Sequence, residues 1–257
     1  MQQKTFQQLP KPHLGLIGHR GAAGLAPENT LEGFQVASAH GIHWVEFDVQ
    51  YCASGEWILF HDADLPRTTN GKGLIFESTW AQLKGLDAGS WFAPTYKNAQ
   101  IPLLEEALRT LLRLNVYPVI EIKIFESPQK QAIADLLHRV QSVWPPTAPP
   151  PLFSSFDLQS LLLLRACDPT LLIGYLVSDL NTEAIALATQ KSFSSLHCQD
   201  ASITPALIAE AHLQKLPLLA YTVNDPLQIQ SLLQQGVFAV FSDLTFLKDE
   251  KHIENSV

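Results

Sequence analysis

Cysteine is scarce in this chain, which has three in 257 residues: Cys52, Cys167 and Cys198. Their odd number argues against a disulfide framework, and they show no metal-ligand spacing. We therefore expect three free thiols, which are typical of a reducing compartment, and a cytoplasmic location.

Positive charge is also in short supply, because 17 Lys and Arg residues stand against 25 Asp and Glu residues, for a formal net charge of −8. Such an acidic chain is not expected to bind nucleic acid or an anionic membrane surface, both of which attract basic proteins. If the ligand carries a phosphate group, local positive charge or a metal ion has to hold that phosphate.

Long hydrophobic runs are absent from the sequence. No apolar stretch approaches the roughly 20 residues of a membrane-spanning helix. The N-terminal segment MQQKTFQQLPKPH lacks the apolar centre of a signal peptide. We expect neither a membrane span nor a signal peptide.

What the sequence does contain is a regular alternation of strand and helix patterns, with 46% hydrophobic and 16% charged residues, as in globular proteins with a sizeable core. Eight strands are expected, at residues 14–17, 43–50, 116–124, 152–155, 171–177, 193–198, 216–223 and 237–242. Helices are expected at 31–40, 103–114, 127–143, 157–167, 181–190, 203–214 and 225–235, and a short one at the C-terminus. Eight strands that are each followed by a helix predict an α/β fold, the (β/α)8 TIM barrel.

The alternation is interrupted after the second expected strand. An extra extended run at 56–60 is followed by the irregular stretch 63–100, with turn signals such as Asn70-Gly71. We interpret 63–100 as a small insertion that borders the barrel mouth. The Pro-rich segment 144–151 is too short to separate domains, so we expect one domain over residues 1–257.

The first expected strand ends in Gly18-His19-Arg20-Gly21. A histidine can act as an acid or a base at neutral pH, and a guanidinium matches phosphate oxygens with two parallel donors. The glycines allow a ligand to approach the backbone closely. Taken alone, the motif fits equally well a surface turn with an exposed His–Arg pair.

Two strands carry charges at alternate positions: Glu46 and Asp48 in the second, and Glu121 and Lys123 in the third. Their apolar neighbours occupy the other face, which in a barrel packs against the helices, so the charges point inward. Three converging carboxylates repel one another unless a cation lies among them, and an all-oxygen set suits Mg²⁺ or Ca²⁺. The alternative is a pair of water-facing strands in which Lys123 pairs with Glu121. Matching charges on two strands make it the weaker interpretation.

A second histidine, His61, follows the extended run at 56–60, so His19 and His61 both lie at strand ends and can form an acid–base pair. His197, on the sixth strand, either faces the mouth or is a core residue, and the second is favoured. The remaining histidines have no accompanying charges and are interpreted as ordinary: His13, His40, His43, His138, His212 and His252.

In order and spacing, these motifs resemble those of the glycerophosphodiester phosphodiesterase family, over residues 14 to about 246. Further matching motifs are Pro27-Glu28-Asn29-Thr30, Ile101-Pro-Leu-Leu-Glu-Glu106, Ser154-Ser155-Phe156 and Thr222-Val223-Asn224. The resemblance implies the barrel, the insertion after its second strand, and metal-dependent hydrolysis of substrates such as glycerophosphocholine or glycerophosphoethanolamine to glycerol 3-phosphate and an alcohol. One departure is Tyr221, where the family often has Trp.

The resemblance also implies roles for individual residues. Glu46, Asp48 and Glu121 would bind one divalent cation, His19 and His61 would be the acid–base pair, and Arg20 and Lys123 would hold the phosphate. We assign His19 as the base and His61 as the acid. The nucleophile is then first the neighbouring hydroxyl of the glycerol, which gives a cyclic phosphate that water opens.

Three other functions remain open at this point. A lysophospholipase D or a phosphatidylinositol-type phospholipase C shares the barrel and the histidines, but either needs an exposed apolar rim for lipid tails. A barrel that binds phosphate or metal without catalysis belongs to a different class. The presence of both histidines and all three carboxylates argues against it.

Overall fold

The computed structural model describes residues 11–124 and 130–248. Eight parallel strands form the central sheet: β1 (Leu16–Gly18), β2 (Trp44–Tyr51), β4 (Tyr117–Ile122), β5 (Leu152–Ser155), β6 (Leu172–Val177), β7 (Ser195–Gln199), β8 (Leu218–Tyr221) and β9 (Ala239–Ser242). The sheet closes on itself because β1 pairs with β9 on one side and with β2 on the other. The predicted eight-stranded barrel is therefore confirmed.

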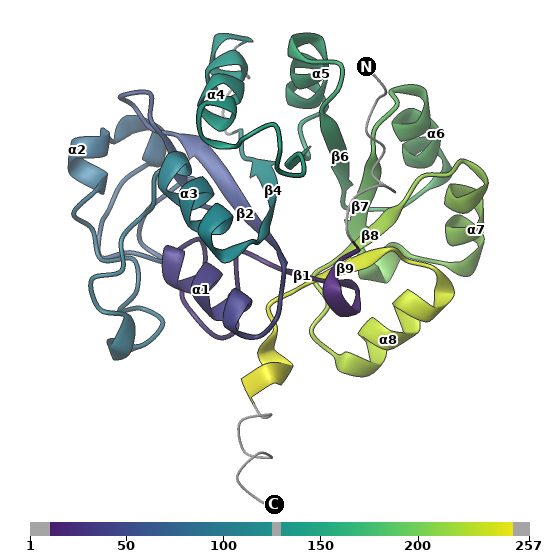
Figure 1. The fold of residues 1–257 in the computed structure, drawn as a ribbon, viewed down its shortest axis with the longest axis horizontal. Coiled ribbons are helices and arrows are strands. Elements are labelled where there is room, and N and C mark those ends of the chain that lie inside the picture. Colours follow the sequence, from purple (N-terminus) through teal and green to yellow (C-terminus); the bar gives the residue numbers. More distant parts are fainter. Residues whose placement is uncertain (1–10, 125–129, 249–257) are drawn as a thin grey trace, which may run out of the picture.

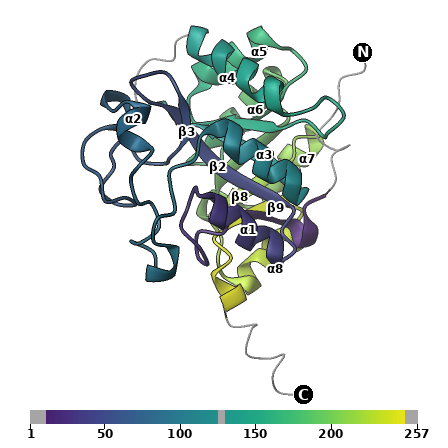
Figure 2. The same cartoon turned by 60° about the vertical axis from the view of Figure 1, so that its left-hand side comes forward.

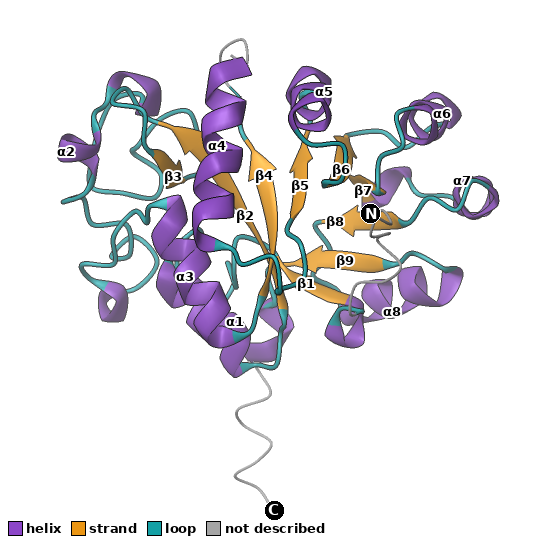
Figure 3. Ribbon diagram, turned by 45° about the horizontal axis from the view of Figure 1, so that its top comes forward, coloured by secondary structure: helices purple, strands orange, loops and turns teal. Residues whose placement is uncertain are grey.

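Helices surround the strands, as Figures 1 and 3 show. They are α1 (Leu31–Ala39), α3 (Leu104–Leu114), α4 (Lys130–Val143), α5 (Leu158–Cys167), α6 (Thr182–Gln190), α7 (Pro205–Leu213) and α8 (Pro226–Gln235). Five of these helices begin after a residue whose side chain accepts a hydrogen bond from the first turn: Thr30, Asp157, Asn181, Thr204 and Asp225. Such caps satisfy backbone donors that a helix leaves unpaired at its start.

The extra run predicted at 56–60 is a short strand, β3 (Trp57–Leu59), that pairs antiparallel with the far end of β2 and lies outside the barrel. It opens the insertion, which also contains the short helix α2 (Trp80–Leu83), and Figure 2 shows both beside β2. The insertion has a core of its own that includes Ile58, Phe60, Leu65 and Ile75. The predicted position of the insertion, after the second barrel strand, is confirmed.

Most strand boundaries differ from the prediction by one or two residues. The first strand begins at Leu16 and not at residue 14, because Leu14 lies in a turn with a φ of 53° and is 68% exposed. The helix expected over 127–143 is described from Lys130 onward, and residues 125–129 lie outside the described residues. At the C-terminus, the described chain ends in a 3₁₀ turn, Thr245–Lys248.

The barrel interior is filled with apolar side chains below the site. They form one cluster: Ile17, Trp44, Val119, Leu152, Leu172, Leu219, Ala239 and Phe241. A second, larger cluster lies between strands and helices and contains Phe47, Ile120 and Ile122. Alternation along β2 and β4 therefore turns Glu46 and Glu121 toward the barrel interior, as expected. Among the helices of 11–124 and 130–248, none is long and apolar enough to cross a membrane.

Candidate active site

Six of the seven predicted site residues line one cavity of about 260 Å³ at the carboxyl ends of the strands: His19, Arg20, Glu46, His61, Glu121 and Lys123. The seventh, Asp48, lies buried behind this lining and pairs with Arg20 and Lys123. The carboxyl ends of barrel strands are where the loops of TIM barrels gather functional groups. The structure thus brings together all seven residues.

The turn after β1 is shaped by glycine. A Cβ on Gly18 would lie 2.0 Å from the carbonyl oxygen of Gly21, so no larger residue fits there. Arg20 has a φ of 48°, and its backbone N–H donates to Oε2 of Glu46 at 2.9 Å. The His19-Arg20 pair is therefore attached directly to the acidic cluster on β2.

The acidic cluster consists of Glu46, Asp48 and Glu121, which are 4%, 1% and 7% exposed. Each offers an oxygen within 4.8 Å of the others' oxygens, so the three could hold a metal ion. Oε1 of Glu46 is buried and has no hydrogen-bond partner among the described residues. A buried carboxylate oxygen without a partner is unfavourable, and a hard divalent cation would satisfy it. The residues present therefore fit an oxygen-ligated metal.

The pKa values of the three carboxyl groups are set by burial, by their mutual repulsion and by the nearby cations. Burial, together with Asp48 and Glu121, raises the pKa of Glu46 well above its usual value. Burial and the charge of Asp48 raise the pKa of Glu121 to about 7. Burial acts in the same direction on Asp48, but Lys123 and Arg20 outweigh it and hold its pKa at about 2. Burial and mutual repulsion therefore disfavour full ionisation of Glu46 and Glu121, and a bound cation would act in the opposite direction.

Two cations supply the local positive charge that an acidic protein needs to bind phosphate. Nζ of Lys123 lies 2.5 Å from Oε1 of Glu121 and 3.2 Å from Oδ1 of Asp48. The guanidinium of Arg20 donates to Oε1 of Glu28 at 2.8 Å, and its Nε lies 3.4 Å from Oδ2 of Asp48. The acidic neighbours outweigh burial and raise the pKa values of Lys123 and Arg20, so both remain charged.

Each predicted histidine is backed by a carboxylate. Nδ1 of His19 lies 2.7 Å from Oδ1 of Asp243, and Nδ1 of His61 lies 2.7 Å from Oδ1 of Asp62. A carboxylate at Nδ1 fixes the ring and its tautomer and leaves Nε2 for proton transfer. Burial, with Lys123 as a further cause, lowers the pKa of His61.

Several supporting residues were not identified from the sequence. Asn29 donates from Nδ2 to Oδ2 of Asp48 at 2.8 Å and accepts from the backbone N–H of Asp48. Gln50 is buried and donates to the backbone carbonyls of Phe60 and Asp62, on either side of His61. Asn29 belongs to a matched motif, whereas Gln50 gave no signal beyond the alternation along its strand.

The residue behind His19 has a partner of its own. Oδ2 of Asp243 accepts from Nδ2 of Asn224 at 2.7 Å, and Oδ1 of Asn224 accepts from the backbone N–H of Asp243. Asp243 follows the last barrel strand directly, as His19 follows the first. Its position at a strand end is the sequence signal from which Asp243 could have been identified.

Replacing Asp243 by asparagine is expected to lower kcat by about 10–100-fold, the range typical when outer partners of functional histidines in metal sites are removed. The neutral amide no longer stabilises a charged His19 ring. Steady-state kinetics with melting temperatures would check this, with Asp168→Asn, at the end of α5, as the matched control. An unchanged kcat in a folded Asp243→Asn variant would contradict the orienting role.

Two residues in the cavity wall, Tyr221 and His197, were noted in the sequence. The hydroxyl of Tyr221 donates to the carbonyl of Val177 at 2.8 Å, so its polar end is bonded to the barrel, and its ring contacts the half-exposed Phe156. His197 is buried, with Nε2 2.9 Å from Oγ of Ser195, and burial lowers its pKa to about 3. His197 is thus a core histidine, as favoured, although it also lines the cavity.

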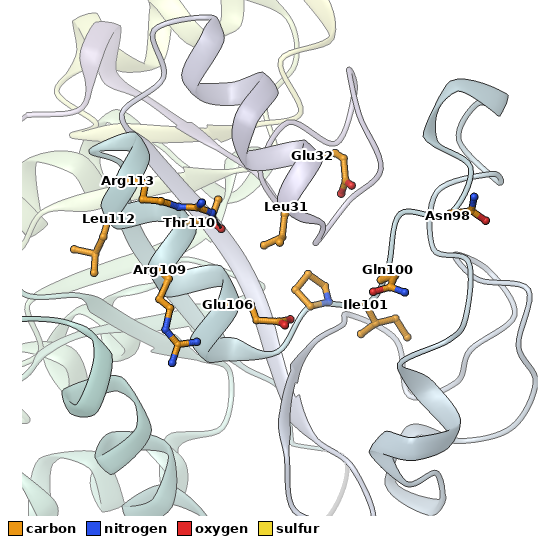
Figure 4. A pocket seen from close by; sticks show the side chains of 11 residues that line it. Leu31, Glu32, Asn98, Gln100, Ile101, Glu106, Arg109, Thr110, Leu112 and Arg113 are labelled. Atoms are coloured by element: carbon orange, nitrogen blue, oxygen red, sulfur yellow. Dashed lines mark hydrogen bonds between the residues drawn. The ribbon is translucent and has the colours of Figure 1, made fainter.

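A larger groove, of about 770 Å³, lies on the side of the barrel between α1, α3 and the segment that precedes α3. Figure 4 shows its lining, in which Glu32 comes from α1 and Glu106, Arg109 and Arg113 come from α3. The carboxylates, histidines and cations described above converge in the smaller cavity. The smaller cavity is therefore the candidate active site.

Comparison with known proteins agrees with this geometry. Residues 19–245 match the model of the glycerophosphoryl diester phosphodiesterase family. One similar structure is that of a phosphodiesterase of Oleispira antarctica, solved in complex with the product sn-glycerol-3-phosphate. The two chains are 34% identical with a TM-score of 0.89, and the match covers 97% of this chain and 98% of the other. A glycerophosphodiester phosphodiesterase of Bacillus altitudinis is 30% identical over 89% of this chain and 94% of its own length. A crystal structure of a glycerophosphodiester phosphodiesterase from Agrobacterium tumefaciens is 25% identical, with a TM-score of 0.76 over 89% of this chain and 95% of its own.

Proposed function

This chain belongs to the glycerophosphoryl diester phosphodiesterase family and is a phosphodiesterase of that class, and from this premise we propose that the 260 Å³ cavity is its active site. The substrates are glycerophosphodiesters such as glycerophosphocholine or glycerophosphoethanolamine, and the products are glycerol 3-phosphate and an alcohol. The observation that carries the proposal is the convergence of two carboxylate-backed histidines, two cations and a buried acidic cluster on one cavity.

Glu46, Asp48 and Glu121 would hold one divalent cation, Mg²⁺ or Ca²⁺, which prefer oxygen ligands. When bound, the cation supplies positive charge that neutralises the phosphodiester and the charge that develops during displacement. Arg20 and Lys123 bind the remaining phosphate oxygens, because both remain charged beside Asp48.

His19 and His61 divide the proton transfers. Nε2 of His19 takes the proton from the attacking hydroxyl, which is the neighbouring hydroxyl of the glycerol, as that oxygen bonds to phosphorus. His61 gives a proton to the departing alcohol oxygen as its bond to phosphorus breaks. Water then opens the cyclic phosphate, with the proton transfers reversed. The charge of a bound phosphodiester favours the protonated form of His61 and so opposes the effect of burial on its pKa.

The direct test is a substrate panel with the purified protein: glycerophosphocholine, glycerophosphoethanolamine, glycerophosphoinositol and lysophosphatidylcholine, each with and without EDTA. We expect EDTA-sensitive release of glycerol 3-phosphate from the first three. Faster cleavage of lysophosphatidylcholine would favour a lysophospholipase D, and release of inositol phosphate would favour a phospholipase C. No turnover on any substrate would favour a barrel that binds without catalysis.

Metal affinity is expected to rise with pH, most clearly below about pH 7. The cation binds ionised carboxylates, and the pKa of Glu121 is about 7, so below that pH a proton must leave before the metal binds. Each displaced proton gives roughly a tenfold loss of affinity for each pH unit below the pKa of its carboxyl. Calorimetric titration of Mg²⁺ and Ca²⁺ in buffers of different ionisation enthalpy measures both the affinity and the proton release. Affinity that does not change between pH 5.5 and 8 would contradict this ligand set.

We also propose a cytoplasmic location. It is supported by the three cysteines, which are all free in the structure, as is usual in a reducing compartment.

A further inference from the structure

Arg67, in the insertion, contacts two carboxylates with one guanidinium. Its Nε and NH2 donate to the two oxygens of Asp62 at 2.5 and 3.0 Å. Its NH1 and NH2 donate to the two oxygens of Glu28 at 2.8 and 2.7 Å. Such two-donor contacts between a guanidinium and a carboxylate are among the most directional charged hydrogen bonds.

Both carboxylates hold a residue of the proposed active site on their other side. Asp62 lies 2.7 Å from Nδ1 of His61, and Glu28 accepts from NH1 of Arg20 at 2.8 Å. A continuous series of charged contacts therefore runs from His61 through Asp62, Arg67 and Glu28 to Arg20. It joins the loop after β1 to the loop after β3, which the backbone connects through α1, β2 and β3.

The backbone around Arg67 is fixed although its side chain is partly exposed. Thr68 and Thr69, which follow it, are buried, and Oγ1 of Thr69 donates to the carbonyl of Leu65. The backbone N–H of Leu65 in turn donates to the carbonyl of Gly73. Arg67 therefore projects from a well-packed turn. This distinguishes its contacts from isolated surface ion pairs, which contribute little to stability.

Electrostatics favour the charged form of both carboxylates. Arg67 is the largest cause that holds the pKa of Asp62 at about 2. Burial raises the pKa of Glu28, but Arg67 and Arg20 outweigh it and bring it below its usual value.

We propose that Arg67 is a positioning residue of the reaction, which fixes through Asp62 and Glu28 the relative placement of the His61 ring and the Arg20 guanidinium. The insertion thereby contributes to catalysis without touching the substrate. This inference rests on the proposed roles of His61 and Arg20.

The central variant is Arg67→Met, which keeps the length of the side chain and removes its donors. Asp62 then loses its support opposite His61, and we expect kcat on glycerophosphocholine to fall by about 10–100-fold, with a smaller change in KM. Lysine cannot bond both carboxylates with two donors each, so the kcat of Arg67→Lys should lie between those of Arg67→Met and the wild type. It also serves if Arg67→Met does not fold.

The chain offers a matched control in Arg139. This arginine also bridges two carboxylates on outer helices, Asp135 of α4 at 2.6 Å and Glu105 of α3 at 2.9 Å. Arg139→Met loses a comparable set of contacts away from the cavity, so kcat should be unchanged. A loss of stability shared by both variants is thereby separated from an effect on the active site.

Two measurements distinguish positioning from a general structural role. In a double-mutant cycle, the effect of Arg67→Met on kcat should be clearly smaller in the Asp62→Asn background than in the wild type, because the contact through Glu28 to Arg20 is then the one contact left for it to disturb. In proton NMR, the downfield Nδ1–H signal of His61, assigned by its loss in Asp62→Asn, should shift or broaden in Arg67→Met and remain in Arg139→Met.

The outcomes are distinct. Wild-type kcat in Arg67→Met, or additive losses in the cycle, would overturn the inference. If the wild-type protein releases no glycerol 3-phosphate from any glycerophosphodiester, the proposed function fails. In that case the Nδ1–H signal of His61 still tests whether Arg67 positions the His61 ring. An unperturbed signal in Arg67→Met would reject the positioning role.

Discussion

Replacing Glu46 by glutamine is expected to remove nearly all turnover and, at the same time, to raise the melting temperature of the metal-free protein. The pKa of Glu46 is raised by burial and by Asp48 and Glu121, so the neutral form of this carboxyl is favoured more than in a free glutamate when no metal is bound. Glutamine resembles that form and can still accept the hydrogen bond that the backbone of Arg20 donates to Oε2. The fold is therefore retained while one ionised ligand is lost.

The loss of activity should reach about 10²–10³-fold or more, as is typical when a group that stabilises transition-state charge is removed. The gain in melting temperature should be about 2–4 °C for each kcal/mol of relieved repulsion. Kinetics over a range of Mg²⁺ or Ca²⁺ concentrations, with melting curves in EDTA, measure both effects. Glu105→Gln, on α3, is a control that should affect neither metal dependence nor turnover. Full activity in EDTA-stripped wild-type protein would show that no metal is needed.

Replacing His61 by alanine is expected to lower kcat on glycerophosphocholine by about 10²–10⁴-fold, the usual value of general acid–base catalysis. Choline is a poor leaving group because its alkoxide is strongly basic, so it needs a proton as it departs. A p-nitrophenyl ester of glycerol phosphate leaves as a stable phenolate and needs that proton far less. On the activated ester, the loss caused by His61→Ala should therefore be much smaller.

The companion variant, His19→Ala, should lose a similar factor on both substrates, because the attacking hydroxyl must be deprotonated in either case. Rescue of His19→Ala by the activated ester would reverse the two assignments. Equal losses for both variants on both substrates would mean that neither histidine acts purely as the leaving-group acid.

The barrel itself could be predicted from the sequence because its signals are local. Apolar runs, strand–helix alternation and turn residues define the order of elements, and β3 stood out as an extra extended run. Alternation also predicted correctly that Glu46 and Glu121 face inward, since the period of a strand allows one choice of face once the apolar side is known. The start of β1 was wrong because Leu14, although apolar, lies in a left-handed turn.

The partners of the site residues could not be predicted, for a physical reason. Asp243 is 224 residues from His19 in sequence, and Arg67 is 39 residues from Glu28. Such contacts depend on which loops the closed barrel places side by side, and single polar residues in loops have no periodicity that would indicate a partner. The sequence drew attention to Arg20, beside His19 at a strand end, and to Lys123, two residues after Glu121, and the family resemblance gave their role. Nothing in the sequence singled out Arg67.

The apolar floor of the barrel limits the routes by which water can reach the proposed active site. Because Ile17, Trp44 and their neighbours fill the interior beneath the site, water has no path to the phosphorus from below, and it must come through the opening by which substrate enters. Water and a departing alcohol would then share one route to and from the cavity. In the proposed mechanism, transfer to the glycerol hydroxyl lets the alcohol leave before water has to enter.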